Sequence, residues 1–125
     1  TPFGVWCEDN ARKLSKHYNI IILTARYCEP VDYAFFECNL NTLLASAVFI
    51  ARDNCHKYGG NANDQSSDSY KAQILKNILG DTQSVILIDD CYKVLEMARL
   101  NGFKAVNACK LYHYNNSDFK TLLGV

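Results

Sequence analysis

Four short runs of apolar residues recur along the chain, and polar or turn-forming residues flank each of them. Runs of this length with such flanks are typical of buried β-strands. We therefore expect four buried strands. They occupy Ile20–Leu23, Ala47–Ile50, residues 85–88 and residues 103–108.

Helical patterns lie between these strands. After Pro30, which suits the first turn of a helix, apolar residues recur at spacings of three and four. This stripe should pack on the sheet. Its members are Val31, Ala34, Phe35, Cys38 and Thr42.

Two further helices are predicted in the second half of the chain, each with an apolar stripe and an end signal. Strands that alternate with helices of this length form βαβ units, whose strands are parallel. The expected fold class is α/β, with a parallel sheet flanked by helices. The two stripes are Tyr70, Ile74 and Ile78 ahead of Gly80, and Val94, Leu95 and Ala98 ahead of Asn101-Gly102.

Two segments depart from this rhythm. Residues 52–68 are rich in turn formers and nearly free of apolar residues, so we expect a long surface loop of the kind that is usually mobile or functional. Residues 112–118 form a polar stretch ahead of a short terminal helix around residues 119–123.

The composition restricts the class of protein. A chain of 125 residues, 49% of them hydrophobic, has the length of one domain, which we place at residues 1–125. Its 13 basic and 13 acidic residues cancel, so an anionic ligand must be held locally rather than by a net field. No apolar run approaches the ~20 residues needed to cross a bilayer, and the first residues lack the order of a secretory signal. We expect a cytoplasmic protein without a membrane partner.

Six cysteines allow either three disulfides in a secreted protein or six free thiols. Several of them fall inside apolar periodic segments, where a free cysteine behaves as a small hydrophobe, so we expect buried thiols. Neither Cys-x-x-Cys nor a paired-histidine spacing occurs, and we expect no structural zinc site. The cysteines are Cys7, Cys28, Cys38, Cys55, Cys91 and Cys109.

Polar residues that directly follow the apolar runs have the first claim on a site, because ligands of an open α/β sheet bind beyond the carboxyl ends of its strands. Thr24, Ala25 and Arg26 follow the first run, and Asp89 and Asp90 follow the third. In the alternative interpretation, Thr24 caps the following helix and Arg26 forms an ion pair on the surface.

The adjacent carboxylates Asp89 and Asp90 repel each other and resist burial unless a cation or strong donors compensate. Hard oxygen ligands favour Mg²⁺ over zinc, so the pair predicts a magnesium site. The alternative is that Asp90 caps a helix that begins near Tyr92, while Asp89 merely faces solvent.

These segments resemble motifs of the haloacid-dehalogenase-like (HAD) hydrolase superfamily over nearly the whole chain. Residues 20–26, Ile-Ile-Ile-Leu-Thr-Ala-Arg, resemble its second motif, an apolar strand ending in Thr or Ser that binds the phosphate. Residues 85–90, Val-Ile-Leu-Ile-Asp-Asp, with the helix and strand that follow, resemble its fourth motif. Lys71 lies eighteen residues before Asp89 at the start of a helix, where the superfamily places its phosphate-binding lysine.

The resemblance implies a Rossmann-like fold and a Mg²⁺-dependent phosphatase that forms an aspartyl-phosphate on a nucleophilic aspartate. In that mechanism Thr24 donates to a phosphoryl oxygen and Lys71 offsets the negative charge of the intermediate. Asp89, together with Asp90, would hold the metal. Residues 24–26 and Lys71 would bind the substrate.

The superfamily's first motif, an apolar strand ending in Asp-x-Asp, is not found among the nineteen residues before Ile20. Its strand normally lies between the strands that bear Thr24 and Asp89, so without it two strand edges are unpaired. Three explanations are open: an upstream segment omitted from the chain, residues 3–7 filling the gap, or a degenerate domain. We expect omission, hence an amino-terminally incomplete domain whose 125 residues are inactive alone.

The first residues themselves favour a helix, because Thr1-Pro2 has the pattern of an N-cap followed by proline at the first helical position. The alternative makes residues 3–7 a short strand and Asp9 a displaced nucleophile. Against it, Ala11 stands where the second aspartate belongs.

The leading functional hypothesis is a Mg²⁺-dependent phosphomonoester hydrolase whose substrate is a nucleic-acid 3′-phosphate, a phosphoprotein or a small molecule. The polar loop before Lys71 and the Thr-Ala-Arg ending resemble polynucleotide 3′-phosphatases, while residues 49–60 resemble carboxy-terminal-domain phosphatases that act on phosphoproteins. A second hypothesis is a non-catalytic HAD-like module that binds a partner or a phosphorylated ligand. A third, a response-regulator receiver, conflicts with the order of the residues, because receivers place their acidic pair ahead of Thr and Lys.

Overall fold

The computed structural model describes residues 1–64, 66–78, 82 and 85–125. The chain divides into two compact units, which are described separately. Unit 1 comprises Thr1–Ile22, Cys28–Phe49 and Lys110–Val125, and unit 2 comprises Leu23–Tyr27 and Ile50–Cys109. Among the described residues, no helix has the length and apolar character needed to cross a membrane.

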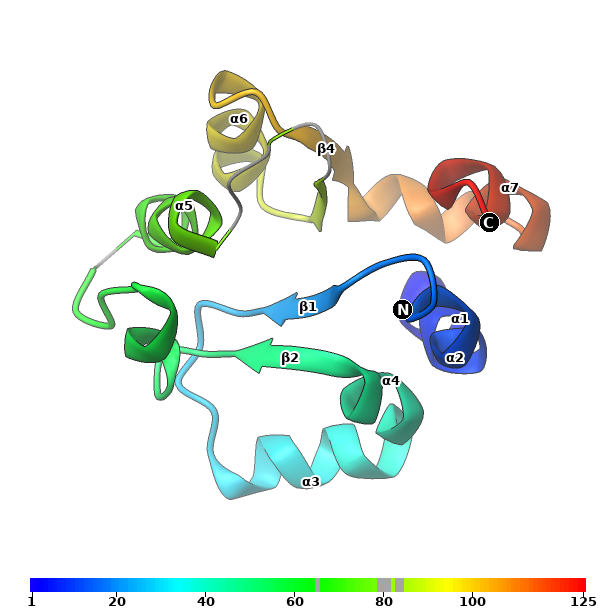
Figure 1. Cartoon of the computed structure of the whole chain (residues 1–125), viewed down its shortest axis with the longest axis horizontal. Coiled ribbons are helices and arrows are strands. Elements are labelled where there is room, and N and C mark those ends of the chain that lie inside the picture. The colour runs from blue at the N-terminus through cyan, green and yellow to red at the C-terminus, as the bar shows by residue number, and fades with distance from the viewer. Residues whose placement is uncertain (65, 79–81, 83–84) are drawn as a thin grey trace. The chain divides into compact units, whose positions relative to one another are not determined.

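Unit 1 is mainly helical. It also contains most of β1 (Ile20–Leu23) and β2 (Ala47–Ile50), which have the predicted bounds and are hydrogen-bonded neighbours. Their arrows point in the same direction in Figure 1, so the pair is parallel. The helices are α1 (Pro2–Asp9), α2 (Ala11–Leu14), α3 (Pro30–Asn39), α4 (Asn41–Ser46) and α7 (Asn116–Leu123), and the 3-10 helix η3 (Ala108–His113) leads into the last of them.

The N-terminal helix is confirmed. Thr1 is the N-cap of α1, its hydroxyl oxygen accepts a hydrogen bond from the Gly4 N–H at 3.0 Å, and Pro2 occupies the first helical position. A strand at residues 3–7, the alternative that made Asp9 a nucleophile beyond a strand end, is therefore wrong. Asp9 is the exposed last residue of a helix.

An aromatic cluster forms the core between α1 and α7. The ring centroid of Phe119 lies 5.6 Å from that of Phe3, 5.4 Å from that of Trp6 and 5.7 Å from that of Tyr114. The indole N–H of Trp6 donates to Asn116 Oδ1 at 2.8 Å, which satisfies the polar atom of a buried side chain.

The apolar stripe predicted for the helix after Pro30 is wrong. Its members Val31 and Phe35 are 70% and 62% exposed. The rings that pack on β2 are those of Tyr33 and Phe36, whose centroids lie 5.5 and 5.3 Å from that of Phe49. α3 ends at Asn39 instead of continuing through Thr42, and its half-buried face is the one whose two aromatic rings pack against Phe49.

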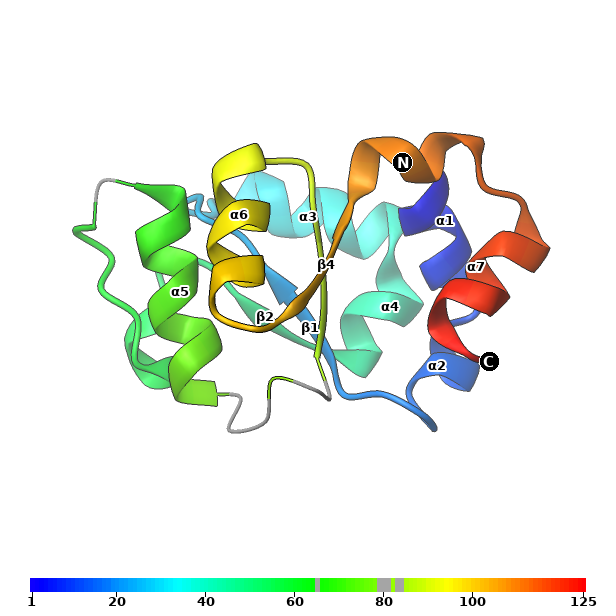
Figure 2. The same cartoon turned by 90° about the horizontal axis from the view of Figure 1, so that it is seen from above.

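Unit 2 is built on a parallel βαβ motif, as predicted. Strand β3 (Ile86–Asp89) pairs with β4 (Lys104–Asn107) through the crossover helix α6 (Tyr92–Leu100), with Asp89 opposite Asn107. Helix α5 (Ser67–Ile78) lies beside α6 in both Figure 1 and Figure 2, and the 3-10 helix η1 (Cys55–Tyr58) contacts α5.

Burial of the two predicted stripes is confirmed for Tyr70, Ile74 and the α6 residues, which are at most 2% exposed. Gly102 ends α6 with a φ of +84°, a backbone conformation that glycine adopts without strain. The expected helix end at Gly80 lies outside the described residues. One apolar cluster in the core of unit 2 consists of Leu75, Leu87, Val94, Ala98 and Phe103.

The strand bounds in this unit differ slightly from the prediction. β3 begins one residue later than expected and includes Asp89, while β4 is shorter than expected at both ends. The α/β class is confirmed in the form of two small two-stranded sheets, β1–β2 and β3–β4.

All six cysteines are free thiols, as expected. Burial, however, holds only for Cys7 and Cys55, because Cys38 and Cys109 are exposed and the other two are half-buried.

Candidate functional site

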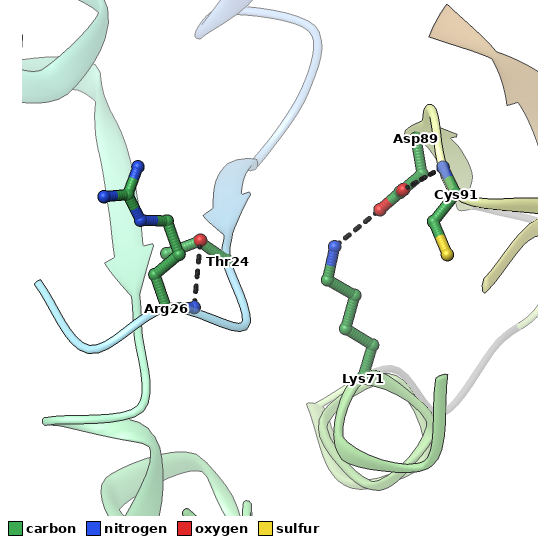
Figure 3. Close-up of polar contacts among 5 residues, drawn as sticks. All are labelled: Thr24, Arg26, Lys71, Asp89 and Cys91. Atoms are coloured by element: carbon green, nitrogen blue, oxygen red, sulfur yellow. Dashed lines mark hydrogen bonds and ion pairs between the residues drawn. The ribbon is translucent and has the colours of Figure 1, made fainter. Parts of the chain in front are cut away.

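A buried ion pair marks the carboxyl end of β3. Lys71 Nζ on the second turn of α5 lies 2.6 Å from Asp89 Oδ2, and the two side chains are only 11% and 8% exposed. Figure 3 shows the lysine side chain extended from the helix towards the carboxylate. Removing either partner would leave a buried charge unpaired, so each residue holds the other in place.

The second oxygen of Asp89 is also occupied. Asp89 Oδ1 accepts a hydrogen bond from the Cys91 backbone N–H at 2.8 Å, which turns the chain from β3 into α6 (Figure 3). The N-cap position of α6 belongs to Cys91, and Asp90 is exposed. The alternative that Asp90 caps this helix while Asp89 faces solvent is therefore wrong, since Asp89 is the buried member of the pair.

The Thr-Ala-Arg segment forms a tight loop after β1. The Thr24 N–H donates to the Ile50 carbonyl at 2.9 Å, and Thr24 Oγ1 accepts from the Arg26 N–H at 3.2 Å. Glu29, not Thr24, occupies the N-cap of α3, so the capping interpretation of Thr24 is wrong. Thr24 and Ala25 are half-buried, whereas Arg26 is exposed.

Arg52 is the main residue that sequence reasoning missed. Its residue exposure is 9%, and its guanidinium donates to three backbone carbonyls, those of Ala25, Ala62 and Asp64. The guanidinium carbon also lies 4.5 Å from the ring centroid of Tyr70, a cation–π contact.

A usable signal for Arg52 existed in the sequence. Arg52 stands two residues after the second apolar run, Ala47–Ile50, where the strand-end rule places candidate site residues. The composition of residues 52–68 instead predicts a surface loop. That loop is only partly a surface feature, because Cys55 is fully buried in η1 and α5 begins at Ser67.

Asp64 organises the start of α5 from the preceding loop. Its Oδ2 accepts from the Ser69 hydroxyl at 2.7 Å and from the Gln73 amide at 2.9 Å, and its Oδ1 accepts from the Ser66 N–H at 3.2 Å. The hydrogen bond from Ser69 is the main reason that the pKa of the Asp64 carboxyl lies below its usual value. Lys71 thus lies on a helix whose first two turns are held in place by these hydrogen bonds.

Asn107 is a second missed residue. It lies opposite Asp89 in the β3–β4 register, and its Oδ1 accepts from the Cys109 N–H at 2.9 Å, the same turn that Asp89 makes with Cys91. The predicted strand over residues 103–108 ran past Asn107, which hid its place at a strand end. An amide and a carboxylate therefore stand side by side at this edge.

The structure brings some of the predicted residues together and not others. Thr24, Lys71 and Asp89 all belong to unit 2, and Lys71 is in direct contact with Asp89. Thr24 forms hydrogen bonds with Ile50 and Arg26. The link from the Thr24 loop to the helix of Lys71 runs through Arg52.

Unit 2 contains a buried carboxylate, that of Asp89, which could serve as a ligand of a hard cation. Residues 1–64, 66–78, 82 and 85–125 contain no cluster of three or more His, Cys, Asp or Glu side chains that could hold a metal by themselves. Mg²⁺ does not require such a cluster, because proteins often bind it through one or two carboxylates together with waters and substrate phosphate. Asp89 fits that role, since each of its oxygens keeps a second lone pair.

Comparisons with known proteins place the chain in a family. Searches of curated proteins and of solved structures gave no match. A scan against protein-family models matched residues 8–121 to "Bacteriophage T5 5'-deoxynucleotidase", a span that includes every candidate residue named above. Because the match covers nearly the whole chain, the protein belongs to the family of the bacteriophage T5 5′-deoxynucleotidase.

Proposed function

We propose that this protein is a 5′-deoxynucleotidase that hydrolyses the phosphomonoester of deoxynucleoside monophosphates. The family assignment over residues 8–121 carries the substrate class. Of the three substrate classes considered from sequence, it favours the small molecule over a nucleic-acid 3′-phosphate or a phosphoprotein. It gives no support to a receiver domain.

The buried Lys71–Asp89 pair is the observation that carries the site. A lysine ammonium held at 2.6 Å from a carboxylate is pre-oriented, so it can meet a phosphate dianion without first losing the freedom of a surface lysine. In the proposal Lys71 neutralises charge on the phosphoryl group, and Thr24 donates its hydroxyl hydrogen to a phosphoryl oxygen. Ala25 and Arg26 complete the substrate-binding loop.

Asp89, with Asp90 as a weaker partner, is proposed to bind Mg²⁺. The metal would supply positive charge that stabilises the developing charge on the transferring phosphoryl group. The buried, doubly hydrogen-bonded Asp89 is already fixed in orientation, whereas the exposed Asp90 is not held in the same way.

The aspartyl-phosphate mechanism and the HAD-like fold belong to the same proposal. The mechanism needs a nucleophilic aspartate, and Asp9, at the exposed end of α1, does not follow a strand as the mechanism requires. The proposed nucleophile is therefore an aspartate other than Asp9, in an Asp-x-Asp motif at the end of a strand.

Phosphate release from a 5′-deoxynucleoside monophosphate by the natural protein tests the proposal. We expect Mg²⁺-dependent turnover that EDTA abolishes, and much slower release from a 3′-phosphorylated oligonucleotide or a phosphopeptide. Lys71→Met should lower kcat/KM by on the order of 10²-fold or more, because it removes charge stabilisation of the transition state. Lys76→Met changes an exposed lysine on the same helix and should leave kcat/KM unchanged.

Two results would contradict the proposal. Binding of the nucleotide without release of phosphate would make the protein a non-catalytic module. Faster hydrolysis of the oligonucleotide or the phosphopeptide than of the mononucleotide would assign the site to another substrate class.

A further inference from the structure

We propose that Arg52 is a positioning residue of this site, which holds the loop that carries Thr24 in register with the helix that carries Lys71. The inference rests on the proposed function, because it assigns Arg52 a role in the same phosphate-binding site. Arg52 itself need not touch the substrate. Its contacts reach three separate segments of unit 2.

The first segment is the Thr24 loop. Arg52 Nε donates to the Ala25 carbonyl, in the middle of the Thr-Ala-Arg sequence, and the Arg52 backbone N–H donates to the Arg26 carbonyl at 2.9 Å. One residue therefore binds two consecutive peptide units of this loop. With the Thr24 N–H bonded to Ile50, the backbone on both sides of the Thr24 hydroxyl is fixed.

The second segment is the loop before α5. Arg52 Nη1 donates to the Ala62 carbonyl at 3.0 Å and also to the Asp64 carbonyl. Tyr27, at the far end of the Thr24 loop, donates its hydroxyl hydrogen to the same Ala62 carbonyl at 3.0 Å. A buried cation and an exposed phenol thus both join the two loops.

The third segment is α5 itself. The guanidinium lies over the ring of Tyr70, which is fully buried and immediately precedes Lys71. Burial of the ring and the contact with the guanidinium hold this side chain in place. Asp64, whose carbonyl Arg52 binds, is also the residue that ties Ser69 and Gln73 of the same helix.

The chemistry requires arginine in particular. A planar guanidinium can donate to several carbonyls in its own plane while its face stacks on an aromatic ring, and a lysine ammonium cannot reproduce that fork. Thr24 and Lys71 come from different elements, and a phosphate must meet both at once. A displacement of about 1 Å between such groups can cost 10²-fold in rate, so the link between them is a determinant of activity.

Arg52→Lys in the natural protein is the test, because it keeps the charge and removes the fork. The matched control is Arg99→Lys, since Arg99 in the same unit also donates to a backbone carbonyl, that of Ala105 at 3.2 Å, but is exposed. The readouts are KM and kcat for a 5′-deoxynucleoside monophosphate, inhibition by inorganic phosphate, and the melting temperature. All assays are run well below the melting temperature of each variant.

For Arg52→Lys we expect KM for the nucleotide and Ki for inorganic phosphate to rise together, by about tenfold, with a fall in kcat. Arg99→Lys should change neither constant. A merely structural role would lower the melting temperature and the active fraction, and so kcat, while KM and the phosphate Ki stayed as in the wild type. That second pattern, or equal effects in the two variants, overturns the inference.

Two further measurements keep the test decisive. If Arg52→Lys does not fold, Tyr27→Phe removes the other link between the same loops at an exposed position, and it should raise KM a few-fold; an unchanged KM would overturn the proposal. If the wild-type protein hydrolyses no deoxynucleotide, the proposed function fails instead. Amide hydrogen exchange then tests the role of Arg52. We expect the amides of residues 24–27 to exchange faster in Arg52→Lys than in Arg99→Lys. Equal exchange rates in the two variants would overturn the proposal.

Discussion

Two neighbouring aspartates at the end of β3 have opposite environments. Asp89 is 8% exposed, pairs with Lys71 and accepts the Cys91 N–H, whereas Asp90 is exposed. The difference follows from the alternation of side chains along an extended chain, which places consecutive residues on opposite sides. Of the two carboxylates, Asp89 is the one that the fold holds fixed.

On the proposed role of Asp89, we expect Asp89→Asn in the natural protein to weaken Mg²⁺ binding and to lower turnover by on the order of 10²-fold or more. The substitution removes the proposed charged oxygen ligand and the counterion of Lys71. Asp90→Asn should change turnover only a few-fold and stability by less than about 0.5 kcal/mol. Mg²⁺ titrations of activity and melting temperatures of both variants measure this. Equal defects that follow the loss of stability would mean that neither carboxylate binds metal.

Helix α7 illustrates how local signals specify an element. Asn115 Oδ1 accepts from the Asp118 N–H at 3.0 Å, and Asp118 Oδ2 accepts from the Asn115 N–H at 2.9 Å, a reciprocal capping box. Phe119 and Leu123 then bury the apolar face four residues apart, and Gly124 ends the helix with a φ of +69°. The predicted helix around residues 119–123 is confirmed, but α7 begins at Asn116, because this capping box lies in the stretch predicted as polar, residues 112–118.

Asn115→Ala should destabilise the protein by about 0.5–2 kcal/mol, because it leaves an N–H of the first helical turn without its acceptor. Urea unfolding monitored by the fluorescence of Trp6 measures the loss, since Trp6 contacts α7 directly. Ser117→Ala, in the first turn of the same helix but outside the capping box, is the control. A loss in the control as large as that in Asn115→Ala would show that the cap contributes nothing of its own.

In the folded molecule as a whole, burial determines how readily the thiol of Cys7 ionises. Desolvation raises the pKa of the buried Cys7 thiol from 9.0 to about 12. In the unfolded chain this thiol ionises near its ordinary value, while the folded protein retains the proton. The stability it contributes is fully present below pH 9 and is lost as pH rises from there towards 12.

The free energy of unfolding should accordingly fall as the pH rises from about 9 towards 12, and Cys7→Ala should make that fall shallower. Cys38 is exposed, so Cys38→Ala should leave the pH dependence as it is in the wild type. Urea unfolding at a series of pH values measures all three proteins. A slope in Cys7→Ala identical to that of the wild type would contradict the prediction.

Local sequence signals predict most of the elements and part of the candidate site. The order of the four strands, the bounds of β1 and β2, the cap of α1 and the end of α6 are local, because periodicity, capping residues and glycine act within a few residues. The separation of α3 from α4 and the 3-10 helices η1 and η3 were not predicted. The candidacy of Lys71 and Asp89 was readable from their places at a helix start and a strand end. The end of β4 was not predicted correctly, so the place of Asn107 at a strand end was not identified from the sequence.

The tertiary structure, in contrast, is needed to identify which helix face packs on a strand and which loops contact each other. No local signal distinguishes the stripe of Val31 and Phe35 from that of Tyr33 and Phe36. The second stripe packs on the sheet because its rings contact the ring of Phe49 on β2. From the composition around it, Arg52 is likewise predicted to be an ordinary loop residue. Its role follows from hydrogen bonds to three backbone carbonyls at other places in the sequence. Non-local contacts bury a side chain according to its partners, and those partners cannot be identified from spacing along the chain.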